Sequence, residues 1–261
     1  MKGFRRWIAG KHSSVEVSEE RGVRALHLGG HAIQSAIRLS RPEELELYYT
    51  RAMMAFMLFE PAPRDILMVG LGGGSIARFV HARMPMTRMT VVEINPRVLA
   101  AARSHFDLPE ADARLAIEIA DGAAYVPAHP DSADVLLLDA FEDGVSVKVL
   151  ATQAFYDACR GALRPGGILV VNFIASERRF GSYLARIEQA FDDQVLLLPS
   201  GDRVNNIILA FKDGPDRVAI AGLKDTAQAL KREFGLPFDR FVADLLQFNA
   251  RTAAHLRLDR P

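Results

Sequence analysis

The alternation of apolar and amphipathic segments along most of this chain predicts an α/β protein. Between residues 65 and 212, short apolar runs such as ILMV, TVVE, VLLL and ILVV alternate with helical patterns of about a dozen residues. Strands that alternate with helices in this way form a parallel, doubly wound sheet. The last two apolar runs, residues 194–200 and 205–212, lie too close together for a crossover helix. We therefore expect them to form an antiparallel hairpin at the edge of the sheet.

Different patterns flank this central region. Residues 13–38 read as short alternating strands joined by glycine turns, which predicts a small antiparallel β unit. Residues 42–59 begin with Pro42 and two acids and continue with apolar residues at helical spacing, which predicts a helix. Residues 216–258 read as a helical tail. We divide the chain into an N-terminal β unit (1–45), a Rossmann-like domain (46–215) and a C-terminal helical tail (216–261).

Composition limits the function classes that need to be considered. Lys plus Arg and Asp plus Glu both number 32, so the chain lacks the basic excess of a nucleic-acid-binding protein. The single cysteine, Cys159, cannot form a disulfide within the chain, and its helical apolar pattern predicts burial. The longest apolar run, residues 52–59, is too short to cross a bilayer, and the N-terminus shows no signal peptide. We expect a cytoplasmic protein without nucleic-acid or membrane partners and without a metal site.

The glycine-rich turn after the first strand of the central region is the first candidate binding site. Ligands of open α/β sheets bind beyond the carboxyl ends of the strands. The turn reads GLGGG at residues 70–74, and its glycines allow close backbone approach to a ligand at a helix N-terminus. The second strand ends in Glu93, whose carboxylate can accept both hydroxyls of an adenosine ribose. Gly70, Gly72, Gly73 and Glu93 therefore predict an adenosine-type cofactor.

The next two strands also end in acidic residues. Asp121 and Gly122 follow the third strand, where an aspartate can bind the adenine amino group and a glycine leaves room for the ring. Asp121 is equally suited to be a helix N-cap, and both roles can hold together. The fourth strand ends in Asp139, followed by Glu142 and Asp143. Clustered carboxylates raise one another's pKa and attract cations. We expect Asp139, with Glu142 as second candidate, to act on the reacting group, whereas Asp143 reads as a solvated loop residue.

A nicotinamide-dependent dehydrogenase would share the glycine turn and Glu93. In this chain, however, Ser75 replaces the third glycine of the G-x-G-x-x-G motif. Neither Asp121-Gly122 nor the RPGG turn at residues 164–167 has a purpose in such an enzyme. The motifs favour a Rossmann-like class I AdoMet-dependent transferase fold, with a mostly parallel seven-stranded sheet and a small N-terminal β unit. Its co-substrate would be S-adenosylmethionine or a close relative.

The stretch from about residue 23 to 212 resembles the spermidine synthase (polyamine aminopropyltransferase) family. LGG at 28–30 with Gln34 and Ser35 is similar to the family's L-D-G-x-x-Q segment, and Tyr49 to the tyrosine of its Y-H-E. ILMVGLGGGS resembles the glycine loop, VVEINP the V-E-I-D-P, and LLDAF the strand that carries the catalytic aspartate. FYDACRGALRPGGILV resembles the segment that ends in L-x-P-G-G.

This resemblance implies an enzyme that transfers an aminopropyl group from decarboxylated S-adenosylmethionine to putrescine, which gives spermidine and methylthioadenosine. It implies no prosthetic group, and a homodimer, since family members often dimerise. Asp139 would accept the proton of the amine, Glu93 would bind the ribose, and Asp121 with Gly122 the adenine. Substrate binding would fall to four residues: Gln34, Tyr49, Asp139 and Glu142.

The chain departs from the family pattern at four positions. Gly73 replaces the aspartate of the family's G-G-G-D-G loop, and Thr50 replaces the histidine of its Y-H-E. Glu142 replaces the second aspartate of D-x-x-D-P, and Asp143 replaces the proline that follows it. An acid in the glycine loop would repel the carboxylate of ordinary S-adenosylmethionine, so Gly73 leaves a small-molecule methyltransferase as an alternative. A non-catalytic nucleoside binder is a third possibility, because a fold does not determine a function.

Overall fold

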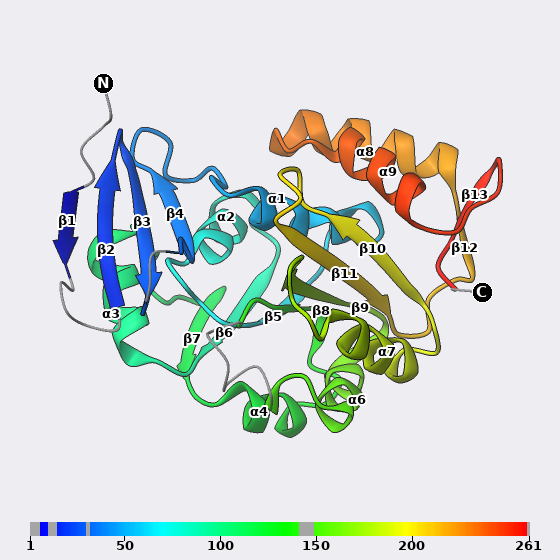
Figure 1. The fold of residues 1–261 in the computed structure, drawn as a ribbon, viewed down its shortest axis with the longest axis horizontal. Helices are drawn as coiled ribbons and strands as arrows, with labels where there is room; N and C mark the ends of the chain where they lie inside the picture. The colour runs from blue at the N-terminus through cyan, green and yellow to red at the C-terminus, as the bar shows by residue number, and fades with distance from the viewer. Residues whose placement is uncertain (1–5, 10–14, 30–31, 141–148, 260–261) are drawn as a thin grey trace.

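A seven-stranded sheet forms the centre of the protein (Figure 1). The computed structural model describes residues 6–9, 15–29, 32–140 and 149–259. The strands lie in the order β10-β11-β9-β8-β5-β6-β7. Their bounds are β5 Asp65–Val69, β6 Arg88–Glu93, β7 Leu115–Ile119, β8 Ala133–Leu138, β9 Leu163–Ile174, β10 Val195–Pro199 and β11 Asn205–Phe211. The predicted doubly wound sheet is confirmed.

The pairing of these strands follows the lengths of their connections. β5 is parallel to both β6 and β8, and the pairs β6–β7 and β8–β9 are also parallel. Helices connect these strands, as parallel crossovers require. β11 is antiparallel to β9 and to β10, and only a short turn joins it to β10. This confirms the predicted edge hairpin.

The central sheet has a hydrophobic core on each face. Successive side chains of a strand point to opposite faces, so β5 contributes Ile66 and Met68 to one core and Leu67 and Val69 to the other. On the first face pack α2 (Ser75–Arg83) and α3 (Pro96–His105), and on the second η2 (Val126–Ala128), α6 (Gln153–Ala162) and α7 (Phe180–Ala190). α4 (Gly122–Tyr125) leads directly into η2.

Cys159 lies on α6 within the second core. Its side chain is buried, as predicted, and burial raises the pKa of the thiol well above its ordinary value. A protonated, enclosed thiol is a packing group rather than a nucleophile.

The N-terminal unit is a four-stranded antiparallel sheet that stands beside the central one (Figure 1). Its strands are β1 (Arg6–Ala9), β2 (Val15–Glu20), β3 (Val23–Leu28) and β4 (Ser35–Arg38). The sequence pattern predicted the last three but not β1. The Ser75 hydroxyl at the start of α2 donates to the Ala36 carbonyl at 3.1 Å, which ties β4 to the glycine turn. The unit thereby covers one side of the main sheet's carboxyl edge.

The predicted helix over residues 42–59 is wrong in its first turns. The chain forms a helix only at α1 (Tyr48–Met53), which continues as the 3₁₀-helix η1 (Met54–Leu58). Arginine side chains bind the carbonyl groups that a longer helix would use itself. Arg51 donates to the carbonyls of Leu45 and Glu46, and Arg78 donates to that of Pro42.

The C-terminal segment is mainly helical, as predicted. It consists of β12 (Arg217–Ala219), α8 (Ile220–Phe234), α9 (Phe238–Phe248) and β13 (His255–Arg257), and β12 pairs with β13 in a small sheet that was not predicted. The two helices pack over η1 and the β10 edge. Within the described ranges, no helix combines the length and apolar character needed to cross a membrane.

Candidate active site

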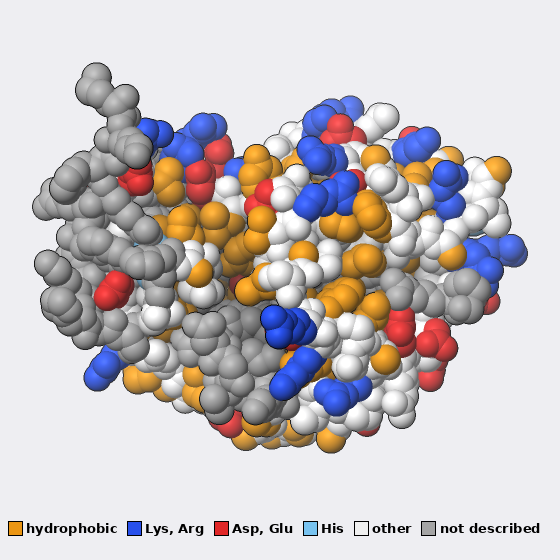
Figure 2. Space-filling view, in the orientation of Figure 1, with side chains coloured by type: hydrophobic (Ala, Val, Ile, Leu, Met, Phe, Trp, Pro, Cys, Tyr) orange, Lys and Arg blue, Asp and Glu red, His pale blue; other side chains and the backbone are white. Residues whose placement is uncertain are grey.

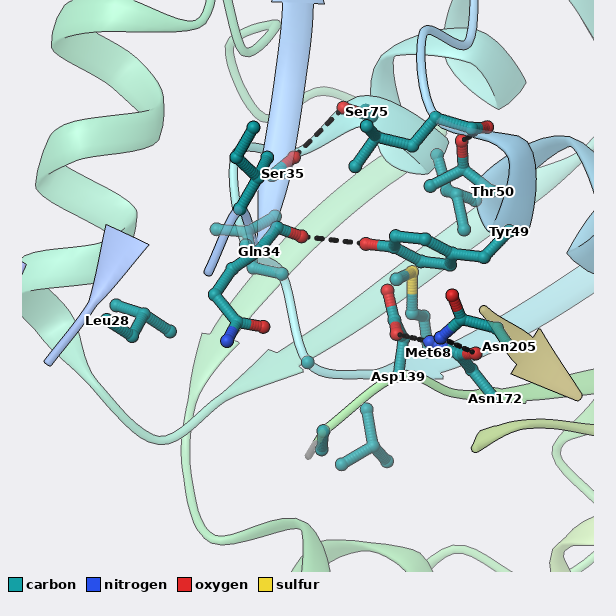
Figure 3. A pocket seen from close by; sticks show the side chains of 18 of the residues that line it. Leu28, Gln34, Ser35, Tyr49, Thr50, Met68, Ser75, Asp139, Asn172 and Asn205 are labelled. Atoms are coloured by element: carbon teal, nitrogen blue, oxygen red, sulfur yellow. Dashed lines mark hydrogen bonds between the residues drawn. The ribbon is translucent and has the colours of Figure 1, made fainter. Parts of the chain in front are cut away.

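The carboxyl ends of β5, β6 and β8 open into a cavity of about 830 Å³, which the N-terminal sheet and α1 help to enclose. Figure 3 shows side chains that converge on it from β4, α1, β8, β9 and β11. A cavity of this volume at the switch point of a doubly wound sheet is where a nucleotide-sized ligand is expected.

Gly70 begins the turn after β5 and is a position that only glycine fits. Its φ angle is +96°, and a Cβ atom there would lie 2.4 Å from the Asp139 carbonyl oxygen. Its amide donates to the Val92 carbonyl at 2.8 Å. Gly70 and the neighbouring Gly72, which the sequence predicts to bind the cofactor, line the cavity. The close approach of this turn to the end of β8 brings the glycine turn and Asp139 together.

Gly73 lies behind the cavity wall instead of on it. A Cβ atom at this position would lie 2.9 Å from both the Ser35 hydroxyl and the Phe106 ring. Its carbonyl faces the buried Arg78 guanidinium, at 3.5 Å. The prediction that Gly73 contacts the cofactor is therefore not supported by its position, because packing against β4 and α3 occupies the space around it.

Glu93 is held rigidly at the end of β6. Its side chain is only 7% exposed and lines the cavity. One carboxylate oxygen accepts from the Leu71 amide at 2.9 Å and the other from the Asn95 amide at 2.8 Å. These two amides fix the orientation of the carboxylate at the cavity wall.

Asp121 and Gly122 lie where β7 leads into α4. Asp121 caps the helix, and its Oδ1 accepts from the Ala123 amide at 2.8 Å. Both residues also line the cavity. Gly122 is buried, and a Cβ atom there would lie 2.5 Å from the Val69 side chain. The geometry is thus compatible with both of the roles predicted for Asp121.

Asp139 follows β8 and lies at the centre of a polar cluster (Figure 3). Its Oδ1 accepts from the Asn172 side-chain amide on β9 at 2.8 Å. Burial raises the pKa of Asp139 to about 7, even though the neighbouring polar groups of Asn172 and Tyr49 act in the opposite direction. A carboxyl with this pKa exchanges protons readily near neutral pH.

Tyr49 on α1 stands across from Asp139. Its hydroxyl donates to the Gln34 backbone carbonyl at 2.7 Å. Burial and, next, the negative charge of Asp139 raise the pKa of the Tyr49 phenol, so it stays protonated. The side-chain amide of Gln34 points away from Tyr49 into the cavity (Figure 3). Tyr49, which is distant in the sequence from Asp139, therefore lies beside it, and Gln34 lines the same cavity.

Three further polar residues line the cavity that the sequence pattern did not predict: Asn172, Asn205 and Asp202. Asn172 and Asn205 are 7% and 9% exposed, and the Asn205 side-chain amide donates to the Asn172 side-chain oxygen at 3.0 Å. Asp202 lies in the β10–β11 turn, and its Oδ1 accepts from the Ser200 hydroxyl at 2.6 Å. The available signal was Asn172, a polar residue that interrupts the apolar strand ILVVNFI. The predicted site residue Glu142, with its neighbour Asp143, lies outside the described residues.

The described lining of the cavity carries only negative charge. Its ionisable carboxylates are Glu46, Glu93, Asp121, Asp139 and Asp202, and the same lining contains no Lys, Arg or His. Of these acids, Glu46 forms an ion pair with Arg38, which lies outside the cavity. The cavity is suited to a cationic ligand.

The rim of the cavity is apolar. Figure 2 shows hydrophobic side chains on this face between the N-terminal sheet and the β10–β11 hairpin. Six exposed hydrophobic residues line the cavity: Ile33, Tyr48, Ile94, Val149, Ile174 and Val204. Acidic groups inside an apolar rim favour a ligand that combines cationic groups with hydrocarbon.

This sheet, with its glycine turn and its acidic residues at successive strand ends, has the Rossmann-like class I AdoMet-dependent transferase fold. Residues 46–191 match the model of the spermine/spermidine synthase domain. The chain is also 41% identical to a polyamine aminopropyltransferase of Chromobacterium violaceum, over 93% of each protein. It belongs to the spermine/spermidine synthase family.

Two solved structures support the fold. A spermidine synthase in complex with the transition-state analogue AdoDATO superposes with a TM-score of 0.72 and 22% identity, over 92% of this chain and 85% of that one. Human methyltransferase-like protein 13 in complex with SAH gives a TM-score of 0.65 and 28% identity, over 72% of this chain and 93% of that one. The first comparison concerns the fold alone, and the second shows that the same architecture also occurs in a protein named after methyl transfer.

Proposed function

We propose that this protein transfers an aminopropyl group from decarboxylated S-adenosylmethionine to putrescine, giving spermidine and methylthioadenosine. The observation that carries this proposal is the acidic cavity, whose described lining holds the carboxylates of Glu93, Asp121, Asp139 and Asp202 and no cationic side chain. Donor and acceptor each carry two positive charges, so both are attracted to this site. Membership in the spermine/spermidine synthase family supports the same chemistry.

Three residues position the nucleoside in this proposal. Glu93, whose carboxylate is oriented by two backbone amides at the end of β6, accepts the ribose hydroxyls. Asp121 accepts from the adenine amino group, and Gly122, whose missing side chain lets the backbone pack against Val69 of β5, lines the cavity beside it. The glycine turn then directs the sulfonium group toward Asp139.

The reaction is a direct displacement at the carbon next to the sulfonium. The amine nitrogen forms the new N–C bond while the C–S bond breaks, and the bonding pair passes to sulfur to give the neutral thioether. Alkyl ammonium groups have pKa values near 10, so the acceptor arrives protonated and must lose a proton. The Asp139 carboxylate binds the ammonium and takes this proton, and Tyr49 and Gln34 orient the amine. Alignment of nitrogen, carbon and sulfur supplies much of the rate.

An S-adenosylmethionine-dependent methyltransferase is the second candidate, favoured by the similarity to the human methyltransferase-like protein and by Gly73 in place of an acid. The two functions differ in the tail of the nucleoside. S-adenosylhomocysteine carries a carboxylate, which meets only acidic charges in the described lining, whereas methylthioadenosine carries none.

Calorimetric titration distinguishes the two functions. We expect methylthioadenosine to bind at least about tenfold more tightly than S-adenosylhomocysteine, a difference of about 1.4 kcal/mol. Adenosine serves as the control, because both functions allow it to bind. Tighter binding of S-adenosylhomocysteine would favour the methyltransferase instead.

Independently, purified protein incubated with decarboxylated S-adenosylmethionine and putrescine should release methylthioadenosine and spermidine. The absence of product with putrescine, cadaverine and spermidine as acceptors would refute aminopropyl transfer.

Asp202 is the residue that we propose for the far ammonium of the acceptor. It lines the cavity at the β10–β11 turn, two strand positions away from Asp139 in the order β11-β9-β8. Its Oδ1 is held by the Ser200 hydroxyl and the Val204 amide. The exposed side chains of Ile174 and Val204 lie in the same wall and suit the methylene chain between the two amines.

Replacing Asp202 with asparagine should raise the KM for putrescine about 3- to 10-fold and change kcat little, because one charge-assisted contact with the bound diamine is lost. Steady-state kinetics with putrescine and with butylamine provide the measurement and its control. Butylamine lacks the second ammonium, so its KM should not change. An equal effect on both acceptors would contradict the assignment.

A further inference from the structure

The side chains of Asn205, Asn172 and Asp139 form a continuous hydrogen-bonded row across β11, β9 and the end of β8 (Figure 3). The Asn205 amide donates to the Asn172 oxygen at 3.0 Å, and the Asn172 amide donates to Asp139 at 2.8 Å. The Asn205 backbone is fixed in turn, since its amide donates to the Ser200 hydroxyl and its carbonyl accepts from the Ser200 amide. The row runs from the hairpin turn to the reacting carboxyl.

An asparagine side chain can rotate by half a turn and exchange its oxygen and nitrogen. In the observed orientation, Asn172 presents its N–H to Asp139. In the reversed orientation it would present its oxygen to the carboxylate, and two acceptors would face each other. Asn205 favours the observed orientation, because its N–H binds the oxygen of Asn172 and leaves the Asn172 N–H for Asp139. Both asparagines are more than nine-tenths buried, so water competes little for these groups.

We propose that Asn205 is a positioning residue for the transfer reaction, which fixes the Asn172 amide so that Asp139 always receives its hydrogen bond. Asn205 acts through Asn172, and its effect is on the proton affinity and orientation of Asp139. This proposal rests on the proposed function, since it assigns to Asp139 the acceptance of the amine proton.

Other groups also act on Asp139 and must be held constant. Tyr49 faces it from α1, and the cavity lining adds the carboxylates of Glu93, Asp121 and Asp202. Glu46 lies in the same lining but is paired with Arg38. Variants that change only neutral amides leave all of these charges in place. Asn205→Leu is such a variant, close in shape and unable to form hydrogen bonds.

Because burial raises the pKa of Asp139 to about 7, wild-type kcat/KM should rise with pH and reach half its maximum near pH 7. Asn205→Leu should move this midpoint upward by about 0.5–1 pH unit, as the hydrogen bond that favours the charged form weakens. Its kcat/KM at pH 6 should fall about 3- to 10-fold, with little change at pH 9. Asn206→Leu is the matched control, because Asn206 is the next residue of β11 and points to the opposite face.

A double-mutant cycle tests whether Asn205 acts through Asn172. Asn172→Leu alone should raise the midpoint at least as much as Asn205→Leu does. Adding Asn205→Leu to Asn172→Leu should then produce no further shift. Additive shifts would show that Asn205 acts directly, and a loss of activity that is uniform across pH would indicate a structural role only. Either result overturns the proposal.

A second measurement separates this inference from the proposed function. In protein labelled with ¹³C at aspartate carboxyl carbons, the Asp139 signal, assigned with Asp139→Asn, reports its pKa without any turnover. Asn205→Leu should raise the pKa of Asp139, and Asn206→Leu should not. If wild-type protein releases no methylthioadenosine, the proposed function fails while this titration still decides the inference. If turnover is normal but the Asp139 titration is identical in all three proteins, only the inference fails.

Discussion

Replacing Asp139 with asparagine is expected to lower kcat for aminopropyl transfer by about 10²-fold or more, the usual effect of losing a positioned base. Asparagine keeps the shape of the side chain and can still accept from the Asn172 amide, but it cannot take the proton of the incoming amine. The measurement is the rate of methylthioadenosine release at saturating donor and putrescine. Asp225→Asn, the same change on the exposed side of α8, is the control and should retain full activity.

The same variant should be more stable than the wild type at alkaline pH. Burial raises the pKa of Asp139 from 3.8 to about 7, so the folded protein favours the protonated form. The stability that this form contributes is complete below about pH 4 and is lost as pH rises through 7. Asp139→Asn removes this loss, and its Tm should exceed that of the wild type by a few degrees at pH 8, with a smaller difference at pH 5. Slower turnover combined with a lower Tm at pH 8 would indicate that the substitution damages the fold instead.

The second large effect is expected for Gly70→Ala. The added Cβ would lie 2.4 Å from the Asp139 carbonyl oxygen, and a φ angle of +96° is unfavourable for alanine. Gly70 directly follows β5 and the crowded oxygen belongs to the backbone directly after β8, so no flexible side chain can move to relieve the overlap. We expect a destabilisation of about 3–5 kcal/mol from overpacking and backbone strain together. For a chain of this size, each kcal/mol corresponds to about 2–4 °C in Tm.

Thermal unfolding checks this expectation, and Gly161→Ala is the control. Gly161 lies in α6, and no atom lies within 4 Å of the position a Cβ would take. Alanine there should raise stability by about 0.5–1 kcal/mol, because it favours the helix. Gly70→Ala should also impair turnover, since relief of the overlap moves Asp139 away from the turn. A Gly70→Ala protein with wild-type Tm and activity would show that Gly70 is not packed closely against the Asp139 backbone.

The periodic pattern of the sequence was sufficient to predict the central sheet, because each face of a strand must bury apolar side chains at every second position. It could not predict where α1 begins. Pro42 and the acids after it match the start of a helix, yet the carbonyls of Pro42, Leu45 and Glu46 are bound by Arg78 and Arg51. One of these arginines, Arg78, comes from α2 and is distant in the sequence, so a pattern of local helix preference cannot predict its contact.

The sequence by itself determined which strand ends carry acids and glycines. Because parallel strands present their carboxyl ends at the same edge of a sheet, it also determined that Glu93, Asp121 and Asp139 share one edge. Only the tertiary structure decided what surrounds them. It turned Gly73 toward Ser35 and Phe106, and it brought Asn205 from an antiparallel hairpin into contact with Asn172. Strand register and packing between distant segments set these contacts, and no spacing along a single chain contains that information.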